Sequence, residues 1–182
     1  MEISASAARR AVLMGCMAAA GYGGLKAHWA LGGELGITDP QSWRSLLAAL
    51  TPAQRFAAFW GTVVLDLLGV ATLLALGLPR FREALGPTVT RAVRGLALLG
   101  AAVLGFVGIV GLASTVGPLV GLWPDSDGGM AAWVFVVVYS CFTLLAAAFA
   151  VAALWRPDHL ESPATVAAGA TSSRAASARR AT

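Results

Sequence analysis

A single acidic residue, Asp66, lies in the middle of a long apolar segment, and it is the side chain most able to do chemistry. A charge at the centre of a membrane-spanning helix costs about 2.5–3.5 kcal/mol on insertion scales, so this carboxylate must be neutralised, paired or hydrated. Thr62, Asp66 and Gly69 share a helical face because they are four and three residues apart. This small, polar face predicts that Asp66 points into a helix bundle.

Three other polar residues are expected at a similar depth in a membrane. Counting about 1.5 Å per residue from the outer helix ends places Lys26 about 8 Å deep and Tyr139 about 12 Å deep. The same count places Tyr22 and Asp66 about 14–15 Å deep. Tyr22 and Lys26 are one helical turn apart. The sequence therefore predicts a buried polar cluster of Tyr22, Lys26, Asp66 and Tyr139, with Ser140 and Thr143 as outer members.

Two interpretations of this cluster remain open. A Lys26–Asp66 pair either fixes the register of the helices and nothing more, or it forms part of a proton or ion relay. A third arrangement is that Lys26 extends toward the headgroups and never meets Asp66, because long cationic side chains can reach the interface from within a helix.

The remaining polar residues predict no metal or cofactor site. His28, Glu34 and Asp39 are potential ligands near the end of the first apolar segment, but their spacing matches no metal motif. Cys16 and Cys141 lie in separate apolar runs without a C-x-x-C pair. No Ser-His-Asp set, carboxylate pair or phosphate-binding glycine loop occurs in a usable setting, so no catalytic residues are assigned.

Composition decides what kind of molecule holds these residues. The chain has 182 residues, of which 58% are hydrophobic and 12% charged. A soluble domain averages about 45–50% apolar and about 25% charged residues, so a cytosolic enzyme, a disordered regulator and a disulfide-stapled module are excluded. The basic residues form no aromatic-interleaved patch, which argues against nucleic acid as a partner. An all-α, polytopic membrane protein with membrane lipids as partners is predicted.

Four segments have the roughly 20 mostly apolar residues that a membrane-spanning helix needs. The spans are expected at about 11–31, 56–78, 95–122 and 131–155, so that residues 1–156 form one four-helix transmembrane domain. The apolar runs show no period-two alternation, which excludes strands. The segment 157–182 is rich in Ala, Ser, Thr and Arg and is predicted to be a disordered basic cytoplasmic tail.

The loops predict the orientation of these spans. Of the 13 basic residues, one side of the membrane receives all except Lys26, Arg44 and Arg55. The positive-inside rule then places both termini in the cytoplasm. Tryptophans agree with this orientation, because five are expected near the outer interface and one near the inner interface. The outer set is Trp29, Trp43, Trp60, Trp123 and Trp133, and the inner one is Trp155.

The first outer loop, 32–55, is predicted to contain structure. Its segment 41–50 reads Q-S-W-R-S-L-L-A-A-L, in which the apolar residues have helical spacing and would bury one face of a short interfacial helix. These residues are Trp43, Leu46, Leu47 and Leu50. The next helix is expected to start with Thr51 as the N-cap, Pro52 as the first helical residue and Gln54 as the reciprocal cap.

The third span is rich in glycine. Small residues recur along one face and allow a neighbouring helix to approach closely. They are Gly105, Gly108, Gly111, Ser114, Gly117 and Gly121. This face either packs within one bundle or forms the surface for a homodimer or a partner helix. Pro118 is expected to kink or end the helix on its outer side.

The end of the first span carries a resemblance. The stretch from Gly21 to Gly36 reads G-Y-G-G-L-K-A-H-W-A-L-G-G-E-L-G. It resembles the signature of small four-helix bacterial membrane proteins, many of them actinobacterial, that are grouped as a domain of unknown function. Their first helix ends in a K-or-H-x-x-W-x-x-G-G pattern, matched here by Lys26, Trp29, Gly32 and Gly33. The resemblance implies a bacterial inner-membrane protein and supplies no activity.

These observations favour a non-enzymatic accessory or regulatory membrane subunit that acts through helix contacts. The alternative is a small proton-coupled transporter, with Asp66 as the coupling group and Lys26 as its counter-charge. A third hypothesis is a membrane enzyme that acts on a lipid or a quinone at the level of Asp66. A homo-oligomer or a partner membrane protein fits the first two hypotheses.

Overall fold

The computed structural model describes residues 3–119 and 130–155, and within these ranges the chain is helical. Its elements are α1 (Ala5–Ala30), α2 (Pro40–Ala49), α3 (Pro52–Phe56), the π-helix η1 (Ala57–Gly61), α4 (Thr62–Gly77), α5 (Pro79–Leu119) and α6 (Ala132–Leu154). In the described part of the chain, strand-like pairing is limited to one bridge between Ile37 and Met130. The predicted all-helical class is confirmed. Gly121, Trp123 and the tail 157–182 lie outside the described residues.

Three helices are long and apolar enough to cross a membrane. They are the continuous run Pro52–Gly77, formed by α3, η1 and α4, then Pro79–Pro118 in α5 and Ala132–Leu154 in α6. The first predicted span, 11–31, falls in α1, which has 26 residues and is long enough. However, α1 carries Arg9, Arg10 and Lys26, and its mean hydropathy is lower than that of the three helices above. Length and composition thus identify three of the four predicted spans.

The helix that carries the third apolar segment begins before that segment. Gly86 has a φ of 70° and interrupts α5, and helical structure resumes at Pro87 rather than at Gly95. A proline fits the first turn of a helix because its missing N–H needs no partner there. The buried Thr90 donates its hydroxyl to the Gly86 carbonyl at 2.7 Å, which closes the first turn. The arginines expected in a loop, Arg91 and Arg94, therefore lie on a helix.

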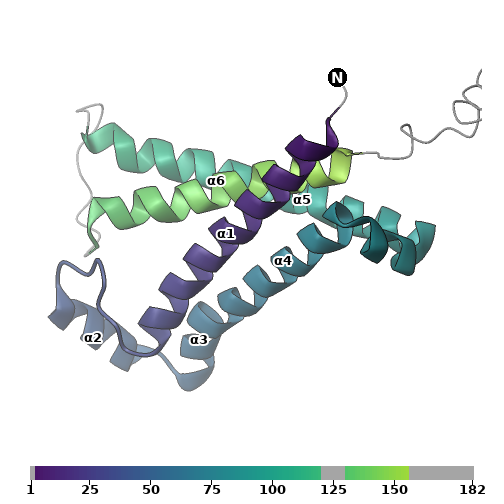
Figure 1. Ribbon diagram of the computed structural model, residues 1–182. Coiled ribbons are helices and arrows are strands. Elements are labelled where there is room, and N and C mark those ends of the chain that lie inside the picture. Colours follow the sequence, from purple (N-terminus) through teal and green to yellow (C-terminus); the bar gives the residue numbers. More distant parts are fainter. Residues whose placement is uncertain (1–2, 120–129, 156–182) are drawn as a thin grey trace, which may run out of the picture.

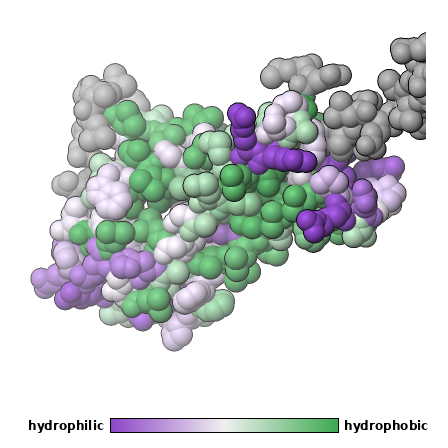
Figure 2. Space-filling view, viewed as in Figure 1, coloured by the Kyte–Doolittle hydropathy of each residue, from purple (hydrophilic) through white to green (hydrophobic). Residues whose placement is uncertain are grey.

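Two helix pairs form the body of the molecule. Figure 1 shows α1 beside α4 and α5 beside α6, with the pairs close together at the ends where α4 meets α5 and further apart toward α2. α6 contacts α1, α4 and α5, so it is the helix around which the others pack. Figure 2 shows an apolar band across the middle of this face and hydrophilic residues at both ends. This distribution is what a bilayer requires of a protein that spans it.

The buried residues fall into two clusters along the helices. The larger cluster joins all four long helices through residues that include Val12 of α1, Leu73 of α4, Ala97 of α5 and Phe149 of α6. A smaller cluster lies near α2 and contains Trp29, Phe59 and Val134, with Trp43 and Leu47 packed against it. The stripe of α2 thus packs partly onto the protein, through Trp43 and Leu47, while Leu46 stays exposed.

The glycine face of α5 packs against α6 of the same chain. A Cβ added at Gly105 would meet the Cβ of Ala146 at 3.6 Å, which is ordinary contact. At Gly108 it would lie 2.9 Å from the backbone nitrogen of Thr143, and at Gly111 it would overlap the Tyr139 ring. These three glycines therefore serve the first predicted alternative, packing within one bundle.

The outer end of this face is described less fully. Gly117 is buried, and the structure describes α5 as far as Leu119, one residue past Pro118.

The tryptophans differ from the predicted belt. Trp29 is only 4% exposed and packs in the smaller cluster, where Trp43 is half-buried. Trp60 and Trp133 are exposed, as expected of residues at an interface. At the other end Trp155 is buried, and the Arg82 guanidinium lies 5.0 Å from its ring centroid. Trp29 and Trp155 thus pack against the protein, and their depth in a membrane stays a prediction.

We expect Gly108→Ala to destabilise the bundle by about 1–3 kcal/mol, because its methyl group would press on backbone atoms of α6 that cannot rotate away. The matched control is Gly95→Ala, where no atom lies within 4 Å of the added Cβ. Alanine forms helix better than glycine by about 1 kcal/mol, so this control should be neutral or stabilising. Thermal unfolding in mild detergent measures both variants, and equal stability of the two would contradict the packing assignment.

Candidate functional site

The predicted polar residues lie between the two apolar clusters. Along α1, Ala19 belongs to the larger cluster and Trp29 to the smaller one, and Tyr22 and Lys26 fall between them. Asp66 occupies the same place on α4, between Phe59 and Leu73. On α6, Tyr139 falls between Val134 of the smaller cluster and Leu145 of the larger one. The three helices thus contribute to one polar layer, which consists of Tyr22, Lys26, Asp66 and Tyr139.

Asp66 lies against α1 at a glycine. Gly23 is buried, and a Cβ added there would lie 3.3 Å from the Asp66 Oδ2 atom. This Oδ2 atom is buried and has no hydrogen-bond partner among the described residues. Gly69, on the same face of α4, lies against the Phe149 ring, so the face points inward as the spacing predicts. A buried carboxylate oxygen without a partner is costly and marks Asp66 as the chemically unusual group of the chain.

Lys26 is surrounded by aromatic rings. Its Nζ atom lies 5.5 Å from the ring centroids of Tyr22 and Trp29 and 5.8 Å from that of Phe59. A cation within about 6 Å of an aromatic face is attracted by the ring quadrupole. Lys26 and Asp66 are within electrostatic range, but no ion pair joins them in the described structure. The aromatic rings, rather than direct contact with Asp66, hold this ammonium group.

The two tyrosines meet through a phenylalanine that sequence reasoning missed. The Phe142 ring lies 4.8 Å from Tyr22 and 6.2 Å from Tyr139, edge-on to both. Tyr139 also stacks on Phe135, and its carbonyl accepts a hydrogen bond from the Thr143 hydroxyl at 2.9 Å. Phe142 is three residues from Tyr139 and therefore on the same helical face, which is the signal that would have found it.

The signature residues at the end of α1 shape the backbone. Gly32 has a φ of 86°, and its N–H donates to the Trp29 carbonyl at 3.0 Å. The Gly33 N–H donates to the His28 carbonyl at 2.9 Å. Together these bonds form a Schellman motif, which satisfies the last carbonyls of the helix and needs a residue that accepts positive φ. The Trp29 indole N–H then binds the Leu35 carbonyl at 3.0 Å and fixes the loop against the helix.

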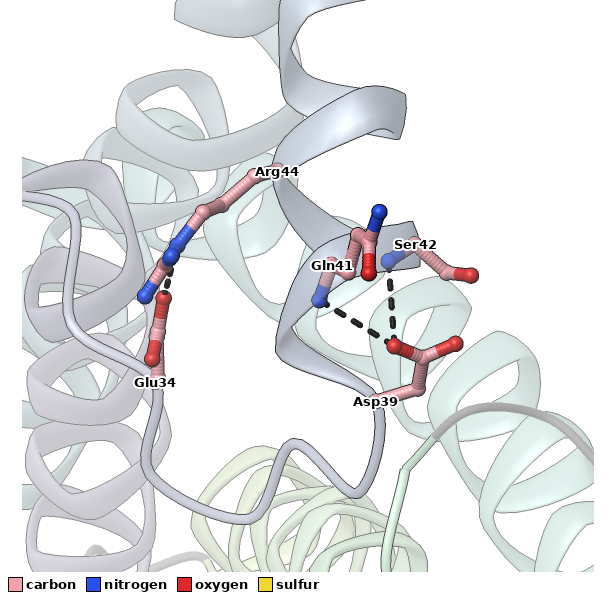
Figure 3. Close-up of polar contacts among 5 residues, drawn as sticks. All are labelled: Glu34, Asp39, Gln41, Ser42 and Arg44. Atoms are coloured by element: carbon pink, nitrogen blue, oxygen red, sulfur yellow. Dashed lines mark hydrogen bonds and ion pairs between the residues drawn. The ribbon is translucent and has the colours of Figure 1, made fainter.

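The residues considered for a metal site have other roles. Figure 3 shows Glu34 paired with Arg44 at 2.7 Å, and Asp39 accepting the backbone N–H groups of Gln41 and Ser42 at the start of α2. Hydrogen bonds from Ser42 hold the pKa of the Asp39 carboxyl below its usual value. His28 accepts the Leu35 N–H through Nε2 at 3.3 Å. No group of three potential metal ligands occurs among the described residues.

The next helix begins as predicted. The Thr51 hydroxyl accepts the Gln54 N–H and the Gln54 side chain accepts the Thr51 N–H, which is a complete capping box, and Pro52 is the first helical residue. The capping box and the Schellman motif leave the helix ends of the outer loop well defined.

No family model, curated protein or solved structure matches the chain. Its function must therefore be argued from its own residues.

We expect Lys26 and Asp66 to be energetically coupled. The unfolding free energies of Lys26→Gln, Asp66→Asn and the double variant should be non-additive by about 0.5–1 kcal/mol, because the two charges interact across the layer. Arg44→Gln with Asp66→Asn serves as the control cycle, since Arg44 lies in the outer loop and pairs with Glu34. Additivity within about 0.3 kcal/mol in the first cycle would mean that Lys26 interacts with the aromatic rings alone.

Proposed function

We propose that the chain is a four-span protein of a bacterial inner membrane, with both termini in the cytoplasm and α2 on the outer side. α1 is then the fourth span. Its 26 residues correspond to about 39 Å, more than the hydrocarbon core of about 30 Å. It also packs against α4 and α6, both of which lie in helices apolar enough to cross a membrane. Arg9 and Arg10 at its beginning favour the cytoplasmic side.

Within that membrane, the function supported best is that of an accessory or regulatory subunit, and the observation that carries it is the surface of α5. Only 17% of the most apolar window of α5 is buried inside the chain, the same share as in the run Pro52–Gly77, so the spacing of its exposed side chains is what distinguishes α5. Glycines on one face meet α6, and large apolar side chains are exposed along the rest. Some of them are spaced alternately by three and four residues, which is the pattern that packs against another helix. They are Leu96, Leu99, Val103, Phe106 and Val110.

A partner helix would make closer van der Waals contact with this stripe than lipid chains do. Helices in a bilayer associate through close van der Waals packing rather than through the hydrophobic effect. Phe106 is 70% exposed in the isolated chain and would be the largest side chain in such a contact. A second copy of the chain is also compatible with the stripe, and the experiment below separates the two.

We expect the tagged chain to co-purify with a stoichiometric membrane partner from native membranes in mild detergent. Replacing Leu99 and Phe106 by alanine should reduce the captured partner about tenfold, which corresponds to roughly 1.4 kcal/mol. The matched control replaces the exposed Val64 and Leu67 of α4, and it should keep the partner. Mass spectrometry identifies what is captured, and light scattering gives the particle mass. A pure homo-oligomer with no partner would reject the accessory role.

A second function, proton-coupled transport, is favoured by the buried, unpartnered Oδ2 atom of Asp66. A carboxyl group that lacks a hydrogen-bond partner inside a membrane is able to bind and release a proton when its surroundings change. Lys26, held among aromatic rings within electrostatic range, would act as the counter-charge of the deprotonated form.

If the chain carries protons, Asp66→Asn should abolish their movement into proteoliposomes under an imposed membrane potential, read with a trapped pH-sensitive dye. Asp66→Glu keeps a carboxyl group and should retain part of the signal. Proton movement that is unchanged in Asp66→Asn would exclude this function.

A further inference from the structure

A hollow opens at the α2 end of the molecule, where Phe59, one of the rings around Lys26, forms part of its wall. Its volume is about 330 Å³. It is lined by the end of α1 and by the start of the run from α3 to η1. The lining residues are Ala30, Leu50, Pro52, Arg55, Phe56, Phe59 and Trp60. Apart from Arg55 these residues are apolar or aromatic, so the hollow has one cation and an otherwise apolar lining.

The π-helix η1 sets how the aromatic residues line this hollow. A π-turn accommodates an extra residue and rotates the side chains that follow it, and such turns are frequent at functional sites. Phe59 is turned inward and is buried in the smaller cluster, whereas Trp60 next to it is exposed. Phe56, one turn earlier, is 60% exposed. One wall of the hollow is therefore fixed by the core and the other faces outward.

At this end of the molecule, Arg55 is the cation available to bind an external anion. Lys26 is held among aromatic rings, and Arg44 pairs with Glu34. Arg55 donates one N–H to the Leu47 carbonyl, which positions the guanidinium at the hollow, and no carboxylate in the described structure pairs with it. A guanidinium has five donors in a fixed fork and matches phosphate geometry, so several donors remain for a ligand.

The depth of Arg55 identifies the source of that anion. The run Pro52–Gly77 has 26 residues, or about 39 Å, which exceeds a hydrocarbon core of about 30 Å by roughly two helical turns. Since Gln54 and the charged Arg55 lie at the start of this run and its other end is apolar, the excess falls at the position of Arg55. The guanidinium then lies at the level of lipid phosphates, and the exposed Phe56 and Trp60 lie at the level of the glycerol and the first methylenes.

We infer that this hollow binds the headgroup of an anionic phospholipid, with Arg55 on the phosphate and Phe56 and Trp60 against the start of the acyl chains. A free phosphate would leave the aromatic wall uncovered, and an uncharged lipid would leave the guanidinium without an anion. The inference rests on the membrane insertion of the helices proposed above but not on the accessory role, because lipid binding needs no partner protein.

The test is native mass spectrometry of the full chain, delipidated in detergent and titrated with phosphatidylglycerol. Arg55→Gln should weaken retention of this lipid about tenfold, the usual effect of losing a hydrogen bond to a charged group. Arg44→Gln removes the other outer-loop arginine and should change retention less than twofold. Trp60→Ala should also weaken retention, and Arg55→Lys should restore part of it.

Three results would overturn the inference. The first is equal retention by the native chain and Arg55→Gln. The second is displacement of the lipid by glycerol phosphate at the same concentration, since this would identify a site for soluble phosphate. The third is equal loss in Arg55→Gln and Arg44→Gln, which would indicate attraction to net charge alone. If Arg55→Gln does not fold, Trp60→Ala decides alone, and retention equal to that of the native chain would reject the site.

Discussion

The close approach of helix backbones around α6 is the constraint on which the rest of the structure depends. Between helices in lipid the hydrophobic effect contributes little, so stability has to come from contact at short range. α5 presents Gly108 and Gly111 to α6, and α1 presents Gly15, where an added Cβ would overlap Ala148. On the other side, the Phe149 ring fits against glycines of both α4 and α5. These contacts leave little freedom of register, and they bring the polar residues of three helices to one level.

Sequence reasoning predicted the features that depend on composition and local spacing, namely the apolar runs, the capping box at Thr51 and the inward face of Asp66. It did not show that the third helix begins before its apolar segment, because hydropathy reports the solvent around a segment and not whether the segment is helical. Pro87 starts a helix that carries Arg91 and Arg94 before it becomes apolar. The burial of Trp29 could not be foreseen either, since it depends on α2 and α6 folding over the end of α1.

The polar layer owes its properties to the apolar clusters on both sides of it. The larger cluster closes one side, where Leu73 and Ala152 are fully buried, and the smaller cluster closes the other around Trp29. Between them the Asp66 Oδ2 atom is buried against Gly23 of α1. The packing of the two clusters therefore keeps the Asp66 Oδ2 atom buried without a hydrogen-bond partner. The aromatic rings around Lys26 hold its ammonium group away from a direct ion pair with this carboxylate.

The contact between the loop after α1 and the start of α6 has a consequence for how the protein is made. The Ala131 N–H donates to the Gly36 carbonyl at 2.8 Å, beside the bridge of Ile37 and Met130. The smaller cluster likewise needs Val134. These partners are synthesised after α1, α2, α4 and α5. The loop after α1 is thus completed by α6, and until that helix inserts, the loop lacks its bond to Ala131 and the smaller cluster lacks Val134.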